Sequence, residues 1–282
     1  MTARNTYATL AEYKAFVNSR GHSGAADATD DAIIDSLLEQ ASRYIDGKTS
    51  RWFYPRIETR NLSIPNYPNV ERALDFDADV LEVITFLNGD GSAISASEYL
   101  LWPANEYPKF GLRIKQSSNF QWLTDNSEYE NVLDLKAVYG YHSNYTSEAW
   151  ESVGTLGAAI TDTTTLAFTM TAGHSLAVGN IARIDNELFI IGTVATNTIT
   201  PLKRGDNGST AATHLNGAVV SVWQPMADCK NATLEIAMQA YKRRFGQSLS
   251  NTETVTASGV VLTPKDIPTL AGEFMKTYRR LV

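Results

Sequence analysis

The sequence contains one cysteine, Cys229, and four histidines that lie far apart along its 282 residues. A single thiol forms no internal disulfide, and scattered histidines lack the paired spacing of a zinc site. Redox and zinc chemistry are therefore not expected. The first ten residues have no apolar signal-peptide core, and no window approaches the roughly 18 to 20 apolar residues of a membrane span. The sequence predicts a soluble protein made in the cytoplasm.

Enzyme signatures are missing as well. The sequence has no phosphate-binding loop, dinucleotide fingerprint, zinc-protease motif or serine nucleophile elbow. The densest carboxylate cluster suggests a cation site or a glycosidase pair, but it lacks the register of a calcium loop, and a charged rim explains it better. Its members are Glu71, Asp75, Asp77, Asp79 and Glu82. We expect no catalytic site, no cofactor and no metal.

The charge is acidic overall and unevenly distributed. The net charge is −7, and residues 1–150 carry 13 Lys and Arg against 21 Asp and Glu. Residues 226–282 reverse the balance, with eight basic against five acidic side chains. Because an acidic chain repels phosphate, sequence-specific nucleic-acid binding is disfavoured. The basic C-terminal end is suited to an acidic protein surface.

Helical periodicity appears at both ends of the chain. Thr9 and Glu12 have the spacing of a capping box, which predicts a helix over residues 9–20. Apolar residues at helical spacing predict a second helix over 30–47, and these two helices form an antiparallel hairpin. Asp228 is the expected N-cap of a third helix over 229–245, and a last helix is expected over 266–280.

The middle of the chain changes to the two-residue period of strands. Strands are expected over 56–64, 80–87, 112–115 and 132–141. From about residue 155 the composition shifts to Thr, Ala, Val and Gly, and short strands are expected over 164–170, 180–185, 188–194, 198–203 and 218–223. The sequence thus predicts an α+β protein in three parts: a helical hairpin with a strand-rich region (1–150), an inserted small β-barrel or sandwich (151–225), and C-terminal helices that complete the core (226–282).

One short motif has two interpretations. Residues 204–210 contain the tripeptide Arg-Gly-Asp, which suggests a receptor-binding loop. The glycines at 205 and 208 equally supply the positive φ of a tight turn, and three-residue motifs recur by chance. The structural interpretation is preferred.

Basic side chains recur on the two C-terminal helices. Lys242, Arg243 and Arg244 end one helix, where they favourably meet the negative end of its dipole. Lys276, Arg279 and Arg280 place a second basic cluster on the next helix, which makes partner binding as well supported as the structural interpretation. Aromatic and Arg side chains are common interface hot spots. The candidate partner-binding residues are Tyr241, Lys242, Arg243, Arg244, Phe274, Tyr278, Arg279 and Arg280.

Several of these segments resemble the head-to-tail connector (adaptor) proteins of tailed bacteriophages. Residues 9–14, 30–34, 41–46 and 49–53 are similar to the family's opening helical hairpin. Residues 138–141 are similar to its last strand, which in the family leads directly into a helix like 228–244. Here about 80 residues intervene. The intervening part, with 182–187, 203–210 and 217–220, is similar to a small β module seen in phage virion proteins.

The resemblance implies a structural virion protein without enzymatic activity. Its subunits would form a ring of about a dozen copies between the portal vertex of the capsid and the tail, with two different complementary faces on each subunit. The implied partners are further copies of the chain, the portal protein, and tail or tail-completion proteins. DNA would pass through the channel without sequence-specific binding, and no membrane is involved. An acidic channel wall suits this role because it discourages phosphate adhesion within a Debye length of ~8 Å.

Two other classes stay open. One is a carbohydrate- or receptor-binding β module on a helical scaffold, as in a tail or baseplate component, which exposed aromatic residues on one face of 155–224 would favour. The other is a hydrolase, which a cleft joining two carboxylates in the Glu71 to Glu82 region would favour.

Overall fold

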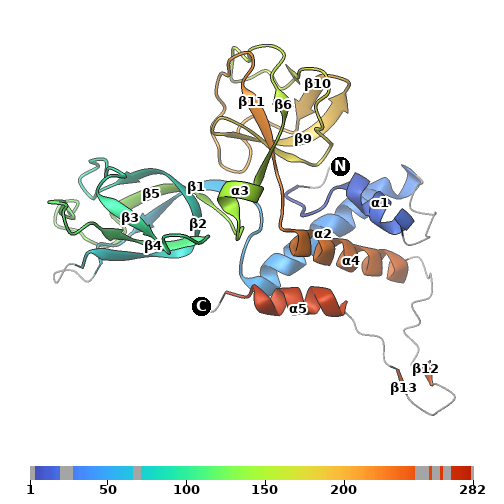
Figure 1. The fold of residues 1–282 in the computed structure, drawn as a ribbon, viewed down its shortest axis with the longest axis horizontal. Coiled ribbons are helices and arrows are strands. Elements are labelled where there is room, and N and C mark those ends of the chain that lie inside the picture. Colours follow the sequence, from blue (N-terminus) through green and yellow to red (C-terminus); the bar gives the residue numbers. More distant parts are fainter. Residues whose placement is uncertain are drawn as a thin grey trace.

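The computed structural model describes residues 4–19, 28–65, 71–244, 254–255, 261–262 and 268–280. It combines helices with antiparallel sheets, which confirms the predicted α+β class. In Figure 1 the helices lie at one end of the long axis, a five-stranded sheet lies at the other, and a six-stranded sheet lies above the junction between them. No helix in the described residues has the length and apolar character needed to cross a membrane.

The longer helices lie close to their predicted positions. They are α1 (Leu10–Ser19), α2 (Asp31–Thr49), α4 (Ala227–Arg244) and α5 (Thr269–Thr277), with a short 3-10 turn, Ala28–Asp30, before α2. Residues 20, 245, 266 and 267, at the ends of the predicted helices, lie outside the described residues. Asp228 was expected to precede the third helix as its cap. It lies in the first turn instead, because α4 begins at Ala227.

The predicted capping box at the start of α1 is confirmed. The backbone N–H of Glu12 donates to Oγ1 of Thr9 at 3.2 Å, and the backbone N–H of Thr9 donates to Oε2 of Glu12 at 2.7 Å. These two bonds satisfy N–H groups that have no partner inside the helix. The chain therefore enters α1 at a position that its local sequence determines.

Helix α2 has apolar contacts on two sides. One buried cluster joins it to α1 and α4, and a second joins it to α4, α5 and the start of the chain that leads into the sheet. Burying each large apolar side chain stabilises the fold by roughly 1.5 to 3 kcal/mol. The first cluster includes Tyr13, Val17, Ile34, Leu38, Leu234 and Ala237, and the second includes Ile45, Phe53, Cys229, Ala232, Ala271, Phe274 and Met275. The first helices of the chain and the last ones thus share one core.

The five-stranded sheet comes from the middle of the chain. Its strands are β1 (Arg56–Leu62), β2 (Ala73–Leu87), β3 (Tyr99–Trp102), β4 (Lys109–Ile114) and β5 (Leu133–Tyr139), in the order β1-β5-β2-β4-β3. Strand β2 begins seven residues earlier than the strand expected over 80–87. Its first half alternates buried Leu74 and Phe76 with exposed Asp75 and Asp77, which is the period of a half-buried strand, but these carboxylates were interpreted only as a charged rim. Strand β3 was not predicted.

The six-stranded sheet follows a short helix, α3 (Tyr145–Glu148). Its strands are β6 (Trp150–Thr155), β7 (Phe168–Thr169), β8 (Ile181–Ile184), β9 (Glu187–Ala195), β10 (Thr198–Pro201) and β11 (Val219–Trp223), in the order β6-β11-β8-β9-β10-β7. Strand β6 was not predicted, and only two residues of the strand expected over 164–170 are paired. A separate two-stranded pair, β12 (Thr254–Val255) and β13 (Val261–Leu262), lies between α4 and α5 in sequence. Residues 150–223 are called the β module below.

The two ends of the β module lie side by side. Trp150 of β6 pairs with Trp223 of β11, and the backbone N–H of Gln224 donates to the carbonyl oxygen of Ala149 at 2.9 Å. Just outside the module, Oγ of Ser143 lies 3.3 Å from Sδ of Met226. The chain therefore leaves the end of the five-stranded sheet and returns to almost the same place before it enters α4 (Figure 1).

The β module is also packed against the rest of the chain. A buried cluster joins Ile57, Leu81 and Val138 of the five-stranded sheet to Leu188 and Trp223 of the module. The indole Nε1 of Trp223 donates to the carbonyl oxygen of Phe53 at 3.0 Å. The β module thus shares buried apolar surface with the five-stranded sheet.

Candidate functional site

The candidate partner-binding residues on α4 lie at its C-terminal end. Tyr241 is half-buried, and its hydroxyl donates to Oδ2 of Asp30 at 2.6 Å while its ring packs against Tyr13. Lys242 is half-exposed, and Arg243 and Arg244 are exposed. The three cations are accessible to a partner, whereas the tyrosine also supports the packing of α4 on the beginning of α2.

The aromatic candidates on α5 serve the protein's own core. Phe274 is only 6% exposed, and its ring centroid lies 5.3 Å from that of Phe53. The expectation that Phe274 anchors a partner is therefore wrong for this fold, because the side chain is already buried. Tyr278 is half-buried against Phe53 and Tyr141. Burial and then a hydrogen bond with Asp228 raise the pKa of Tyr278 to about 12, so the hydroxyl stays protonated at neutral pH.

The two basic clusters do not form one surface. Pro268, just before α5, lines the same surface cavity as Arg243 near the end of α4. Tyr278, at the other end of α5, bonds to Asp228 in the first turn of α4. Helices α4 and α5 are therefore antiparallel, so the basic last turn of α4 and the Arg279–Arg280 pair, which follows the end of α5 instead of lying on it, are at opposite ends. The backbone N–H of Arg280 donates to the carbonyl oxygen of Thr49 at 2.8 Å, on the side that faces the five-stranded sheet. The two basic clusters are separated because α4 and α5 pack antiparallel, and the sequence does not reveal this packing.

Arg280 belongs to a charged junction between the helices and the sheet. Burial raises the pKa of Asp79, and the nearby cations of Arg51 and Arg280 oppose this effect. Nη1 of Arg51 lies 2.7 Å from Oδ2 of Asp79. Arg279, by contrast, is exposed. Of the two adjacent arginines, Arg279 is the one better placed for a partner.

The Arg-Gly-Asp sequence is not an exposed recognition loop. The side chains of Arg204 and Asp206 are 5% and 4% exposed. Nε and Nη2 of Arg204 donate to the two carboxylate oxygens of Glu187 at 2.8 and 2.9 Å, a bidentate pair. The structural interpretation of this tripeptide is confirmed, because its charged groups hold the loop against β9.

His214 completes this buried network. Its Nδ1 lies 2.7 Å from Oδ2 of Asp185, and its Nε2 lies 2.9 Å from Oε2 of Glu187. Burial alone would raise the pKa of Glu187, but hydrogen bonds from Arg204, Ala212 and His214 outweigh burial and lower that pKa. In the part of the chain that the structure describes, no group of three or more His, Cys, Asp or Glu side chains is arranged to hold a metal ion. The network positions loops and offers no open coordination site.

The carboxylate cluster of the sequence is divided among different partners. Asp77 pairs with Arg60 at 2.8 Å, and Glu82 accepts a hydrogen bond from the hydroxyl of Tyr145 at 2.8 Å. Glu71 lines a shallow cavity together with Arg72, Ile114, Phe120, Gln121 and Trp122. That cavity contains a single carboxylate, so it lacks the paired acids that a glycosidase requires.

The feature expected of a carbohydrate-binding module is also missing from the described residues. The aromatic side chains of 155–224, Phe168, Phe189 and Trp223, are each at most 5% exposed. They pack inside the β module or against the five-stranded sheet. The exposed aromatic platform that would favour sugar binding is therefore not present on this part of the chain.

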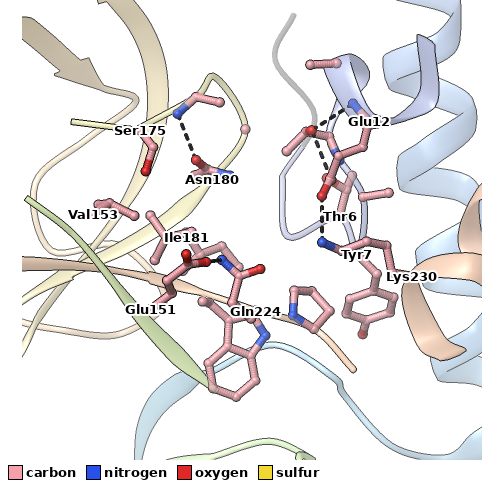
Figure 2. Close-up of a pocket in the computed structure, with 18 residues that line it drawn as sticks. Thr6, Tyr7, Glu12, Glu151, Val153, Ser175, Asn180, Ile181, Gln224 and Lys230 are labelled. Carbon is pink, nitrogen blue, oxygen red and sulfur yellow. Dashed lines mark hydrogen bonds and ion pairs between the residues drawn. The ribbon is translucent and has the colours of Figure 1, made fainter. Parts of the chain in front are cut away.

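A cleft of about 390 Å³ lies between the β module and the helices (Figure 2). One wall is formed by residues 6–9, Ala11, Glu12 and Lys230, and the other includes Glu151, Val153, Ser175, Ala177 and residues 179–181. Nζ of Lys230 lies 2.6 Å from Oε1 of Glu12, and Nε2 of Gln224 donates to Oε2 of Glu151 at 2.8 Å. Its charged side chains thus already interact with neighbouring groups, and the cleft is best described as the joint between two parts of the fold.

A second cavity, of about 430 Å³, runs along the surface between α2 and α4. Leu37, Ala41 and Tyr44 line it from α2, and Ile236 and Ala240 line it from α4. Its rim is formed by Gln40, Gln239, Arg243 and Pro268. This α2–α4 groove was not recognised in the sequence, because apolar residues at helical spacing are expected to be covered. It is the described feature best suited to receive a partner.

No protein-family model, curated protein or solved structure matches this chain. The site residues therefore have to be assessed from their own geometry. Among the described residues, the α2–α4 groove and the exposed cations at the end of α4 are the features suited to binding.

Proposed function

We propose that the protein is a head-to-tail connector: a structural virion protein whose copies form a ring of about a dozen subunits between the portal vertex and the tail. In this proposal α1 and α2 are the opening helical hairpin, and the β module is a small barrel or sandwich inserted into the connector core. The protein works in the neck of the particle, and DNA passes through the ring. It performs no catalysis.

The observation that carries the proposal is the adjacency of the two ends of the β module. The resemblance requires the last strand of the core to lead into the C-terminal helix, and about 80 residues separate them in sequence. Gln224 bonds to Ala149 at 2.9 Å, and Ser143 contacts Met226. Omitting the module would leave β5 leading into α4, as the resemblance implies. The shared core of α1, α2 and α4 supports the same order of elements.

The distribution of charge is compatible with a DNA channel. Residues 56–139, which contain the five-stranded sheet, carry 13 Asp and Glu against seven Lys and Arg. A surface of this sign repels phosphate at short range and allows DNA to slide. The buried aromatic residues of the β module give the carbohydrate-binding alternative no comparable support.

The test is the assembly state of the full chain, alone and with a purified portal protein. Native mass spectrometry and negative-stain imaging should show a closed ring of about a dozen copies bound coaxially to the portal. A chain that stays monomeric or dimeric with and without the portal, at concentrations up to about 100 μM, would exclude the connector role.

A further inference from the structure

Helix α5 shows what the α2–α4 groove accepts. Ala271, Phe274 and Met275, at helical spacing i, i+3 and i+4, are buried in the cluster that contains Ile45 of α2 and Ala232 of α4. The helix thus lies along the groove with one apolar face down, as amphipathic helices do in binding grooves. Its packing is an intramolecular example of the same type of interface.

Among the described residues, this helix covers only part of the groove. It has nine residues and α4 has 18, so at 1.5 Å per residue roughly 13 Å of α4 extends beyond it. The cavity of about 430 Å³ occupies this remainder and begins at Pro268, the residue before α5. Its floor contains Ala41 and Ala240, whose small side chains permit the close approach of another helix.

The charge at the open end of the groove is basic. Lys242, Arg243 and Arg244 form the last turn of α4. Two carboxylates at the start of α2 are engaged, because Asp30 accepts a hydrogen bond from Tyr241 at 2.6 Å and Asp31 pairs with Lys14 at 2.5 Å. An occupant with acidic side chains beside its apolar face is therefore favoured over a basic one.

We propose that the uncovered half of the α2–α4 groove binds an acidic amphipathic helix of the portal protein, end to end with α5. The identification of the partner as the portal protein rests on the proposed connector function. The expectation of an acidic amphipathic helix rests on the shape and charge of the groove. The bound helix continues the apolar contacts of α5 over Leu37, Ala41, Ile236 and Ala240, and its carboxylates meet the basic last turn of α4.

The first experiment measures groove binding without the portal. The probe is a helix-stabilised fluorescent peptide that repeats the spacing of Ala271, Phe274 and Met275 and has glutamates beside this apolar face. Fluorescence anisotropy should show saturable binding to the full chain. Two variants that fill the groove, Gln40→Trp on its rim and Ala240→Trp on its floor, should weaken binding at least tenfold. Asn231→Trp, an exposed position of α4 outside the groove, is the matched control and should bind normally.

Circular dichroism and thermal unfolding identify any variant whose fold has changed. Because Gln40 is exposed, its replacement is the variant that decides the outcome if Ala240→Trp proves unstable. The inference is overturned if the wild-type chain does not bind the peptide, or if Gln40→Trp binds it as tightly as Asn231→Trp does. A peptide with the same composition in scrambled order should bind at least tenfold more weakly.

The second experiment repeats the series with the portal protein. Loss of portal binding by Gln40→Trp, with normal binding by Asn231→Trp, supports the assignment of the occupant. Equal portal binding by all variants overturns that assignment while leaving the connector function standing. If the wild-type chain binds the peptide but not the portal protein, the groove binds helices and the proposed connector function is wrong.

Discussion

The hydroxyl of Tyr7 donates a hydrogen bond to Oδ1 of Asp46, 39 residues further along the chain, and accepts one from the backbone N–H of Phe53 at 2.9 Å. The backbone N–H of Tyr7 donates to Oγ of Ser42 at 3.1 Å. Tyr7 is 1% exposed. One buried side chain thus joins the segment before α1 to α2 and to the chain that enters β1.

The Tyr7→Phe variant tests this junction. Removal of the hydroxyl leaves the N–H of Phe53 without its partner, and an unsatisfied buried donor costs about 1 to 3 kcal/mol. We expect a loss of that size in the free energy of unfolding, measured by urea titration. Tyr44→Phe is the matched control on α2 and should change stability by less than about 0.5 kcal/mol. Equal stabilities of the two variants would show that the bond contributes nothing.

A second prediction concerns the pH dependence of stability. Burial raises the pKa of Asp46 to about 6, although Arg43 and the bond from Tyr7 oppose the increase. The folded state therefore binds this proton more tightly than the unfolded state, whose pKa is near the ordinary value of 3.8. Stability from this group is fully present below about pH 4 and decreases as the pH rises through about 6.

The Asp46→Asn variant removes that dependence. Wild-type stability should lose roughly 3 kcal/mol more than the variant between about pH 4 and pH 7, at 1.4 kcal/mol per pKa unit. Urea unfolding at a series of pH values measures the difference. Parallel profiles for the two proteins would mean that the carboxyl of Asp46 titrates normally in the folded state.

A third prediction addresses the buried ion pair of the β module. Glu187→Gln leaves the guanidinium of Arg204 buried without its counter-charge, which typically costs about 3 to 5 kcal/mol. Asp185→Asn is the control, because the Asp185 side chain is 67% exposed although it contacts the same histidine. Thermal unfolding should show a large decrease for the first variant and a small one for the second. Similar decreases would assign the stabilisation to His214 instead.

Glu187 contributes a pH dependence of stability opposite to that of Asp46, because its pKa is lowered and that of Asp46 is raised. Its folded carboxyl releases the proton more readily than the unfolded one, so the stability that it supplies is present at neutral pH and is lost as the pH falls through the folded pKa. Glu187→Gln should therefore be closest to the wild-type stability in acid. A difference between the two proteins that grows as the pH is lowered below about 4 would contradict this sign.

A fourth prediction tests how the β module docks on the sheet. A Cβ atom at Gly208 would lie 2.0 Å from the carbonyl oxygen of Ile57, whereas at Gly217 it would meet nothing within 4 Å. Both glycines have φ near +80°, so an alanine at either site has the same backbone strain, about 1 kcal/mol. Gly208→Ala should therefore lower the unfolding free energy by at least about 2 kcal/mol more than Gly217→Ala. Equal effects would show that the loop moves away from β1 without cost.

Local chemistry in the sequence predicted most of the helices and the compact strands. The capping box of Thr9 and Glu12 marks the start of α1 because both partners lie within four residues. Strands with continuous apolar residues, such as β9, were also located. Strands β3 and β6 were missed because exposed Leu100 and Trp102 in one, and Glu151 and Ser152 in the other, do not give a regular alternation.

The candidate site was predicted less well, because a binding surface depends on which residues remain exposed after packing. The basic clusters of α4 and α5 looked alike in sequence, and Phe274 looked like an exposed anchor. Antiparallel packing placed the two clusters at opposite ends and buried Phe274 against Phe53. In the described part of the chain α5 is shorter than α4, and the α2–α4 groove begins at Pro268, just before α5.

The sequence by itself determined the α+β class, the capped start of α1, the turn chemistry of residues 204–210 and the acidic charge, since each depends on composition or on neighbours a few residues apart. Tertiary structure alone decided that the ends of the β module meet, that Arg204 pairs with Glu187, and that Tyr7 reaches Asp46. These contacts join residues far apart in the chain. They form because burial in a shared core removes apolar surface from water, and the buried polar groups must then find partners wherever the packed fold places them.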